Sequence, residues 1–304
     1  MQITSPAFKD NSRAALANAQ LQKALGNVRS GFIDKRLKAV GDLPEFEELR
    51  ENGRSIKNHV LANLDIYLEV YEKKVTEVGG KVHWCQTAED ARAAVLDICR
   101  RTNARVVTKG KSMITEEIGL NDFLQSHDIE PVETDLGEYI IQLRGEHPSH
   151  IIAPAVHLNR EQVEADFRRV HSDLPADRRL EEPEELLGEA RRVLRSRYFD
   201  ADVGITDVVG AIAESGTLVV SSDAHGRGSF LVPPVHIAIV RASLIVPDML
   251  DLWPPGVMAP PMPASLVLVT GPSKTADIEG ILITGVHGPR EVRVIVVEPD
   301  RSPA

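Results

Sequence analysis

After Gly79-Gly80 the sequence alternates between short β-rich runs and helical runs, and this alternation constrains the fold more than any other feature. Lys81–Cys85 is typical of a strand, Thr87–Arg101 of a helix, and Arg105–Thr108 of the next strand. This order predicts an α/β fold with a mainly parallel sheet covered by helices on both faces. In such sheets, ligands bind at the carboxyl ends of the strands. The pattern continues with a helix at Glu116–His127 and with strands at Glu130–Glu133, His150–Ala153, Val235–Val240, Ser265–Thr270 and Val292–Val297.

The first part of the chain has a different pattern. From Asp10 to about Val78, apolar residues recur at steps of three and four, which is typical of helices, and the run is interrupted only at Gly41–Pro44. We therefore expect a helical arm at residues 1–78 and an α/β domain at residues 79–304. Between residues 159 and 202 the sequence is densely charged, and Pro175 and Pro183 separate two expected helices with solvated faces.

Composition excludes several classes of protein. The chain has 304 residues and a net charge of -10, which argues against a general role in binding nucleic acid. Its two cysteines provide neither a disulfide framework nor the ligand spacing of a cluster. We find no apolar segment typical of a signal peptide or of a membrane span. We therefore expect a cytoplasmic protein without a cofactor of its own.

Polar chemistry is concentrated between Ala201 and Val240. Two β-rich runs, Val208–Ala213 and Thr217–Ser221, meet at Glu214-Ser215-Gly216, where the glycine permits a positive φ and close approach of the backbone to an anion. An ordinary hairpin followed by a solvated loop is an equally good interpretation. The other polar residues of this stretch are Asp223, His225, Arg227, Ser229 and His236.

Three further turns carry candidate groups. The turn Thr108–Ser112 contains Lys109 and Lys111 between a strand and a helix, where it is suited to a carboxylate or a phosphate, although a basic surface turn remains the alternative. In Gly271–Gly280, Ser273 is expected to cap a helical turn beside Lys274 and Thr275. His287 lies in a glycine turn, where an imidazole serves as acid, base or ligand, or simply as polar surface.

Metal binding is not predicted. His147, His150 and His157 lack a suitable helical spacing, because Pro148 disfavours a helix there. The sequence also contains no dinucleotide, nucleotide-phosphate or hydrolase fingerprint.

Several ordered motifs are similar to those of one known family. Three of them are KGKSMITEEIGLNDFL (Lys109–Leu124), ETDLGEYIIQL (Glu133–Leu143) and PSHIIAPAVHLNREQV (Pro148–Val163). These three resemble the larger B subunit of the lactate-utilisation family. Three later segments resemble the smaller C subunit. They are GITDVVGAIAESGTLVV (Gly204–Val220), LVPPVHIAIVRASLIV (Leu231–Val246) and the run from Gly271 to Glu298. The resemblance covers about Gly79 to Glu298, and the helices before it also resemble the B subunit.

This resemblance implies a LUD domain, a Rossmann-like fold of the class that includes ribose-5-phosphate isomerase, CoA transferases and formyltetrahydrofolate cyclo-ligase. It also implies a part in a cytoplasmic system that oxidises L-lactate to pyruvate with iron–sulfur partners. The sequence departs from the B subunit because it lacks the cysteine-rich, ferredoxin-like segment and has Ser221–Gly226 in place of an asparagine-glycine loop. Iron–sulfur clusters are therefore expected only in partner subunits.

Three hypotheses follow. The first is an accessory subunit of lactate oxidation that binds a small anionic ligand. The second is an enzyme similar to acyl-CoA transferases, with Glu214 as carboxylate nucleophile. The third is a binder of a sugar phosphate or a folate-type ligand, and the oligomeric state stays open. The candidate catalytic residues are Glu214 and His287, and the candidate ligand-binding residues are Lys109, Lys111, Ser112, Ser215, Gly216, Thr217, Arg227, His236, Ser273, Lys274 and Thr275.

Overall fold

The structure is a computed structural model, and it describes residues 7–146, 148–150, 153–222, 226–252, 263–277 and 279–298. The chain packs as two compact units. Unit 1 consists of residues 1–48 and 136–193, and unit 2 of residues 49–135 and 194–304. The predicted division into an arm of residues 1–78 and a domain of residues 79–304 stays a prediction, because compact packing alone does not define folding domains.

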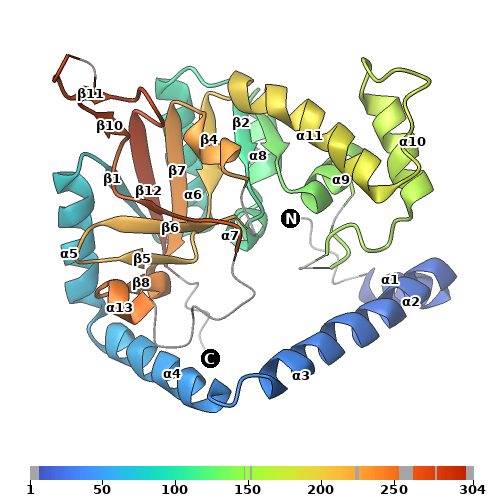
Figure 1. The fold of residues 1–304 in the computed structure, drawn as a ribbon, viewed down its shortest axis with the longest axis horizontal. Helices are drawn as coiled ribbons and strands as arrows, with labels where there is room; N and C mark the ends of the chain where they lie inside the picture. The colour runs from blue at the N-terminus through green and yellow to red at the C-terminus, as the bar shows by residue number, and fades with distance from the viewer. Residues whose placement is uncertain are drawn as a thin grey trace. The chain divides into compact units, whose positions relative to one another are not determined.

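A parallel sheet of six strands forms the centre of unit 2 (Figure 1). Every neighbouring pair in this sheet is parallel, which confirms the predicted α/β fold. Its central strands are buried and apolar, as expected for a sheet that is covered on both faces. In spatial order the strands are β1 (Lys81–Cys85), β12 (Glu291–Val297), β7 (Val235–Arg241), β4 (Val203–Thr206), β2 (Val106–Lys109) and β3 (Glu130–Glu133).

One face of this sheet packs against α6 (Ala88–Arg101) and α8 (Leu120–Gln125). The apolar side of α6 contributes five buried side chains, so the helix is fixed by packing. The single helix predicted at Glu116–His127 is instead two helices, α7 (Met113–Glu117) and α8. They are separate because Gly119 adopts a left-handed conformation with φ 62°.

A capping box defines the start of α6. The Thr87 hydroxyl accepts a hydrogen bond from the Asp90 amide at 3.1 Å, and the Asp90 carboxylate accepts one from the Thr87 amide at 3.1 Å. We expect Thr87→Ala to lower the free energy of unfolding by about 1 kcal/mol, and Thr87→Ser to leave it nearly unchanged. Urea denaturation of the three proteins checks this expectation. Equal losses in both variants would show that the methyl group of Thr87 matters more than its hydroxyl.

The other face of the parallel sheet packs against α5 (Leu64–Glu77), α12 (Gly228–Leu231) and a second sheet of four strands. The predicted hairpin is present, since β5 (Gly210–Ile212) and β6 (Thr217–Ser221) are antiparallel and are joined by residues 213–216. Strand β4 was not predicted, and the strand predicted at Val208–Ala213 is shorter than expected. The second sheet has the order β8 (Ile245–Val246), β5 (Gly210–Ile212), β6 (Thr217–Ser221), β9 (Leu266–Val269).

Smaller elements complete unit 2. A two-stranded hairpin, β10 (Lys274–Thr275) with β11 (Ile283–Thr284), lies beside the ends at which β7 and β12 begin (Figure 1). The 3₁₀ turn at Ala242–Leu244 and α13 (Met249–Leu252) follow β7. Most of α4 (Phe46–Ala62) also belongs to this unit.

Unit 1 is helical in the residues that the structure describes. Its N-terminal helices have no buried side chain among their described residues. The strand predicted at His150–Ala153 falls partly outside the described residues, and His150 and Ala153 themselves are not in a strand. The helices of this unit are α1 (Phe8–Ala17), α2 (Ala19–Val28), the π-helical turn Arg29–Ile33, α3 (Asp34–Gly41), α9 (Leu136–Arg144), α10 (Arg160–Val170) and the first part of α11 (Pro183–Asp200).

Candidate functional site

The candidate residues of unit 2 fall into two groups at opposite ends of the parallel sheet. Lys109 is the last residue of β2, and its neighbour in register on β3 is Glu133, also a last residue. Ser273, in contrast, donates its backbone N–H to the Pro289 carbonyl at 2.8 Å, just before β12 begins. Because all six strands run in the same direction, the first group lies at the carboxyl edge and the second at the amino edge. The structure therefore does not bring Lys109 and Ser273 into one pocket.

The Lys109 ammonium is enclosed at the carboxyl edge. Its side chain is 1% exposed and contacts two carboxylates, Glu133 at 2.8 Å and Glu116 at 2.9 Å. It also donates to the Thr115 hydroxyl at 2.8 Å. An ammonium has three N–H donors, and these three contacts use all of them. An anion would have to displace a carboxylate in order to bind Lys109, so its role in ligand binding stays a prediction.

Electrostatics stabilise the charged form of this lysine. Burial lowers the pKa of Lys109, but attraction by Glu133 and Glu116 outweighs that effect and raises the pKa above its usual value. Burial raises the pKa of Glu133, and Lys109 opposes the rise. Asn121 donates to Glu133 at 2.6 Å, while its own side-chain oxygen is buried without a hydrogen-bond partner among the described residues. The pair is thus a buried ion pair with an amide beside it.

Of the other two residues of the basic turn, Ser112 has a local role. The Ser112 hydroxyl accepts a hydrogen bond from the Thr115 amide at 3.3 Å and so caps α7. Lys111 is half-buried between Gly110 and Ser112. Sequence reasoning missed Glu133, Glu116 and Asn121. The sequence did indicate Glu133, because Glu133 ends one predicted strand and Lys109 directly follows another.

The residues around the β5–β6 turn lie against α5. Ser215, Thr217 and Thr270 form a chain of hydroxyl groups, with oxygen–oxygen distances of 2.7 Å and 2.8 Å. The Lys274 ammonium donates to the carbonyl of Val78, just after α5, at 2.9 Å. The structure therefore does bring together candidate residues from two distant segments, at the C-terminal end of α5.

Gly216 has the positive φ that was predicted, at 68°, but its neighbour is a helix. A Cβ atom added at Gly216 would lie 2.5 Å from the backbone nitrogen of Val75 and 2.7 Å from the backbone carbon of Lys74. The close approach that the glycine allows is thus made by α5. Glu214, two residues earlier, is exposed, and its backbone N–H donates to the Pro247 carbonyl at 3.0 Å. Its role as a nucleophile stays a prediction.

The helical turn predicted at Ser273 is wrong, since residues 274 and 275 form a strand of the β10–β11 hairpin. Extended backbone leaves no run of free amide groups there for an anion. His287 is exposed in the turn that follows this hairpin. The next residue, Gly288, lies close to Ser273, because an added Cβ would be 3.1 Å from the Ser273 Cβ.

The remaining candidates from the central stretch are dispersed. Asp223 and His225 lie outside the described residues. Arg227 is exposed immediately before α12, whereas His236 is fully buried in β7. The His236 ring shares a hydrogen bond of 2.8 Å with the Thr206 hydroxyl and lies 5.2 Å from the Phe230 ring. Among the described residues, no group of three histidines, cysteines or carboxylates is placed to hold a metal ion.

Unit 1 contains a buried polar chain that sequence reasoning missed. The Glu189 carboxylate contacts His171 Nδ1 at 2.8 Å, and His171 Nε2 contacts the Tyr139 hydroxyl at 2.9 Å. Arg192 also donates to Glu189 at 2.8 Å and 2.9 Å. Hydrogen bonds from Arg192 lower the pKa of Glu189, although burial opposes this effect. These side-chain hydrogen bonds connect α9, the end of α10 and α11.

The hydrogen-bonded chain of Tyr139, His171 and Glu189 predicts that the stability of the protein depends on pH. A carboxyl group whose pKa is lower in the folded chain stabilises the fold above its unfolded pKa, and that contribution is lost as the pH falls through the folded pKa. Glu189→Gln should therefore lower the free energy of unfolding by about 1.5 kcal/mol at pH 7 and reduce the loss of stability below about pH 4.5. Urea denaturation at several pH values measures both effects. Parallel curves for the two proteins would contradict the prediction.

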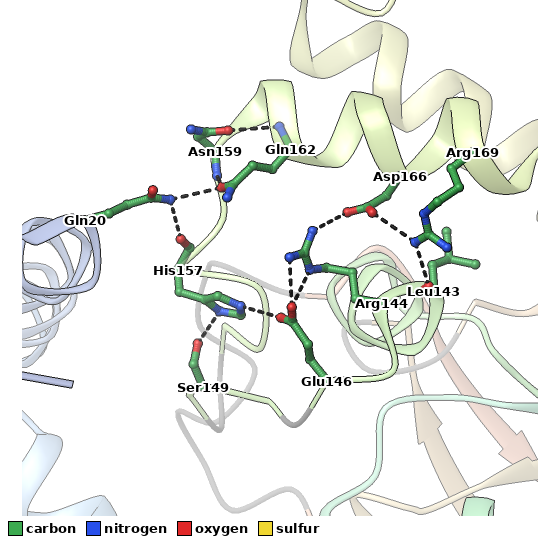
Figure 2. A network of polar contacts seen from close by, with 10 residues as sticks. All are labelled: Gln20, Leu143, Arg144, Glu146, Ser149, His157, Asn159, Gln162, Asp166 and Arg169. Carbon is green, nitrogen blue, oxygen red and sulfur yellow. Dashed lines mark hydrogen bonds and ion pairs between the residues drawn. The ribbon is translucent and has the colours of Figure 1, made fainter. Parts of the chain in front are cut away.

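Unit 1 contains a second polar network (Figure 2). This network borders a cavity of about 210 Å³. Arg144 at the end of α9 donates to Glu146 at 2.9 Å and to Asp166 at 2.6 Å. Glu146 contacts His157 at 3.0 Å, and His157 contacts Ser149 at 2.6 Å. Sequence reasoning considered only one residue of this network, His157, and only as a metal ligand. The cavity is lined by Asn18, Gln20, Leu21, Arg144, Ser149, His157, Leu158 and Gln162.

Comparison with known proteins gives a consistent result. The LUD domain family model matches residues 68–297. The lactate utilization protein B of Bacillus velezensis is 34% identical over 99% of this chain and 63% of its own length, and that of Bacillus subtilis is 33% identical over 99% and 62%. An uncharacterized electron transport protein of Escherichia coli, YkgF, is 34% identical over 97% and 61%. The chain thus spans about three fifths of the length of these relatives.

One solved structure also matches. A DUF162 family protein from Deinococcus radiodurans is 17% identical, and the match covers 77% of this chain and 98% of that chain with a TM-score of 0.42.

Proposed function

Because the chain belongs to the LUD domain family, we propose that it serves lactate utilisation as an accessory subunit in the oxidation of L-lactate to pyruvate. The observation that carries this proposal is the identity of about 34% to lactate utilization protein B, which extends over 99% of the chain. The proposed partners are iron–sulfur subunits, because oxidation of L-lactate to pyruvate releases two electrons that an acceptor must take up. The proposed location is the cytoplasm. Among the described residues, no helix has the length and apolar character needed to cross a membrane.

Growth on L-lactate tests the proposed role. Deletion of the gene is expected to abolish growth on L-lactate as sole carbon source, and the full chain supplied in trans is expected to restore it. Affinity purification of the tagged chain from lactate-grown cells should recover proteins that contain iron–sulfur clusters. Normal growth of the deletion strain would contradict the proposal.

We place the proposed anionic ligand at the carboxyl edge of the parallel sheet, beside Lys111. Three features support this placement. Ligands of parallel α/β sheets bind at this edge, Lys111 follows the last residue of β2 by two positions, and a buried ion pair fixes that residue, Lys109, in place.

Binding of L-lactate and pyruvate, measured by titration calorimetry, tests this placement. Lys111→Met should weaken binding about 10-fold, which corresponds to one hydrogen bond to a charged group. Lys81→Met removes an exposed lysine at the start of β1 and is expected to leave the affinity unchanged. Equal affinities of the Lys111→Met and Lys81→Met proteins would overturn the placement.

The alternative hypotheses predict different results. An enzyme similar to acyl-CoA transferases would form a covalent adduct with acyl-CoA that is visible by mass spectrometry and absent in Glu214→Gln. A binder of sugar phosphates or folates would be stabilised by those compounds in a thermal-shift screen.

A further inference from the structure

Ser149, His157 and Glu146 form a linear hydrogen-bonded chain in unit 1 (Figure 2). The Ser149 hydroxyl oxygen lies 2.6 Å from His157 Nδ1, and His157 Nε2 lies 3.0 Å from a carboxylate oxygen of Glu146. Both ring nitrogens are therefore engaged, one with a hydroxyl group and the other with a carboxylate. This is the order of groups by which a carboxylate orients a histidine and the histidine activates a hydroxyl group.

The contacts fix where the protons lie. Arg144 hydrogen bonds lower the pKa of Glu146, so this side chain is ionised and only accepts hydrogen bonds. The proton of a neutral His157 must then reside on Nε2, which leaves the lone pair of Nδ1 facing Ser149. The Ser149 hydroxyl has a second acceptor, the Pro154 carbonyl, at 3.1 Å. The shorter contact of 2.6 Å favours donation to His157.

The hydroxyl group is accessible from the cavity. Ser149 is exposed, and both Ser149 and His157 line the space of about 210 Å³. The lining combines amide groups with apolar groups, the latter from Leu21 and Leu158. The volume is below that of pockets for drug-sized ligands, which indicates a small ligand with one short apolar part.

We propose that Ser149 is a nucleophile, that His157 is its general base, and that the site accepts small acyl compounds such as short esters or thioesters. The oxygen of Ser149 forms a bond to the acyl carbon while its proton moves to His157 Nδ1. The bond to the alcohol or thiol then breaks, and His157 returns the proton to this leaving group. Water hydrolyses the acyl-serine in the same way and releases a carboxylic acid. Glu146 positions the ring of His157.

A purely structural role makes a different prediction. Ser149 also donates its backbone N–H to the Pro154 carbonyl at 3.0 Å, so the same residues close a loop. In that case substitution of His157 would change stability but not the reactivity of the Ser149 hydroxyl. The rate of covalent labelling therefore separates the two interpretations.

The experiment uses phenylmethylsulfonyl fluoride as the probe on the full chain. The serine oxygen forms a bond to sulfur, fluoride leaves, and the histidine takes up the proton. Time-resolved digestion and mass spectrometry follow the labelling of each serine. Ser126 is a matched internal control, because it is also exposed and lies 3.1 Å from Nδ1 of His127. That Nδ1 also contacts the Phe123 carbonyl at 2.8 Å, so it must donate a proton and is not available as a base.

We expect Ser149 to be labelled about 100-fold faster than Ser126, and His157→Gln to remove this difference, since general bases contribute 10²–10⁴-fold. Glu146→Gln should slow labelling of Ser149 about 10-fold through loss of one charged hydrogen bond. Ser149→Ala should remove the adduct and the release of p-nitrophenolate from p-nitrophenyl acetate. Circular dichroism verifies that each variant is folded. Equal labelling of Ser149 and Ser126 in the unsubstituted chain, or labelling of Ser149 that is unchanged in a folded His157→Gln protein, would overturn the proposal.

Discussion

Replacement of Lys109 by methionine is expected to lower the free energy of unfolding by about 3–5 kcal/mol. Methionine has a similar length, so little packing is lost. The cost arises because the Glu133 side chain is 2% exposed and would have neither its cation nor water to stabilise its charge. Urea denaturation at pH 7 measures this loss.

Two controls make this result specific. Lys81→Met removes a lysine from an exposed position of the same sheet and should change stability by less than about 0.5 kcal/mol. The double variant Lys109→Met with Glu133→Leu should be more stable than the single variant, because it also removes the uncompensated carboxylate. A loss below about 1 kcal/mol for Lys109→Met would mean that water or a partner group compensates Glu133.

Gly216→Ala is expected to lower the free energy of unfolding by about 2–4 kcal/mol. Two effects contribute to this loss. The backbone has φ 68°, which disfavours any residue with a Cβ atom, and that atom would lie 2.5 Å from the backbone of α5. A helix backbone cannot rotate away as a side chain would, so the turn or α5 must shift. Thermal and urea denaturation measure the change.

Gly280→Ala separates the two effects. Gly280 has the same φ of 68°, but nothing lies within 4 Å of the position that a Cβ would occupy. This variant should therefore show only the cost of the left-handed backbone, about 1 kcal/mol. If Gly216→Ala and Gly280→Ala were equally destabilising, close packing against α5 would not be the reason for a glycine in the β5–β6 turn.

The layered fold was predictable because its signal is local. Strand β3 has the predicted bounds, Glu130–Glu133, and the helix predicted at Thr87–Arg101 differs from α6 only in its capping residue. Short apolar runs and capping residues depend on neighbours in the sequence, so they can be recognised in a single chain. Strand β4 was missed, because its four residues follow a charged helix and no glycine or proline lies between the two elements to indicate a turn.

The candidate site was harder to predict because it depends on strand order. Lys109 and Ser273 each lie beside a strand, and their sequence contexts are alike. Only the topology shows that one turn is at the carboxyl edge and the other at the amino edge. Likewise, the positive φ of Gly216 was predictable, but its neighbour was not, since α5 is about 140 residues earlier in the chain.

The enclosure of Lys109 has a practical consequence for chemical footprinting. Amine reagents such as acetic anhydride modify lysines that solvent reaches, and a side chain that is 1% exposed is protected from them. Acetylation of Lys109 would therefore occur only when the contacts around its ammonium, from α7 and from Glu133 of β3, open transiently. Its rate, followed by mass spectrometry, would report how often this edge of the sheet opens under native conditions.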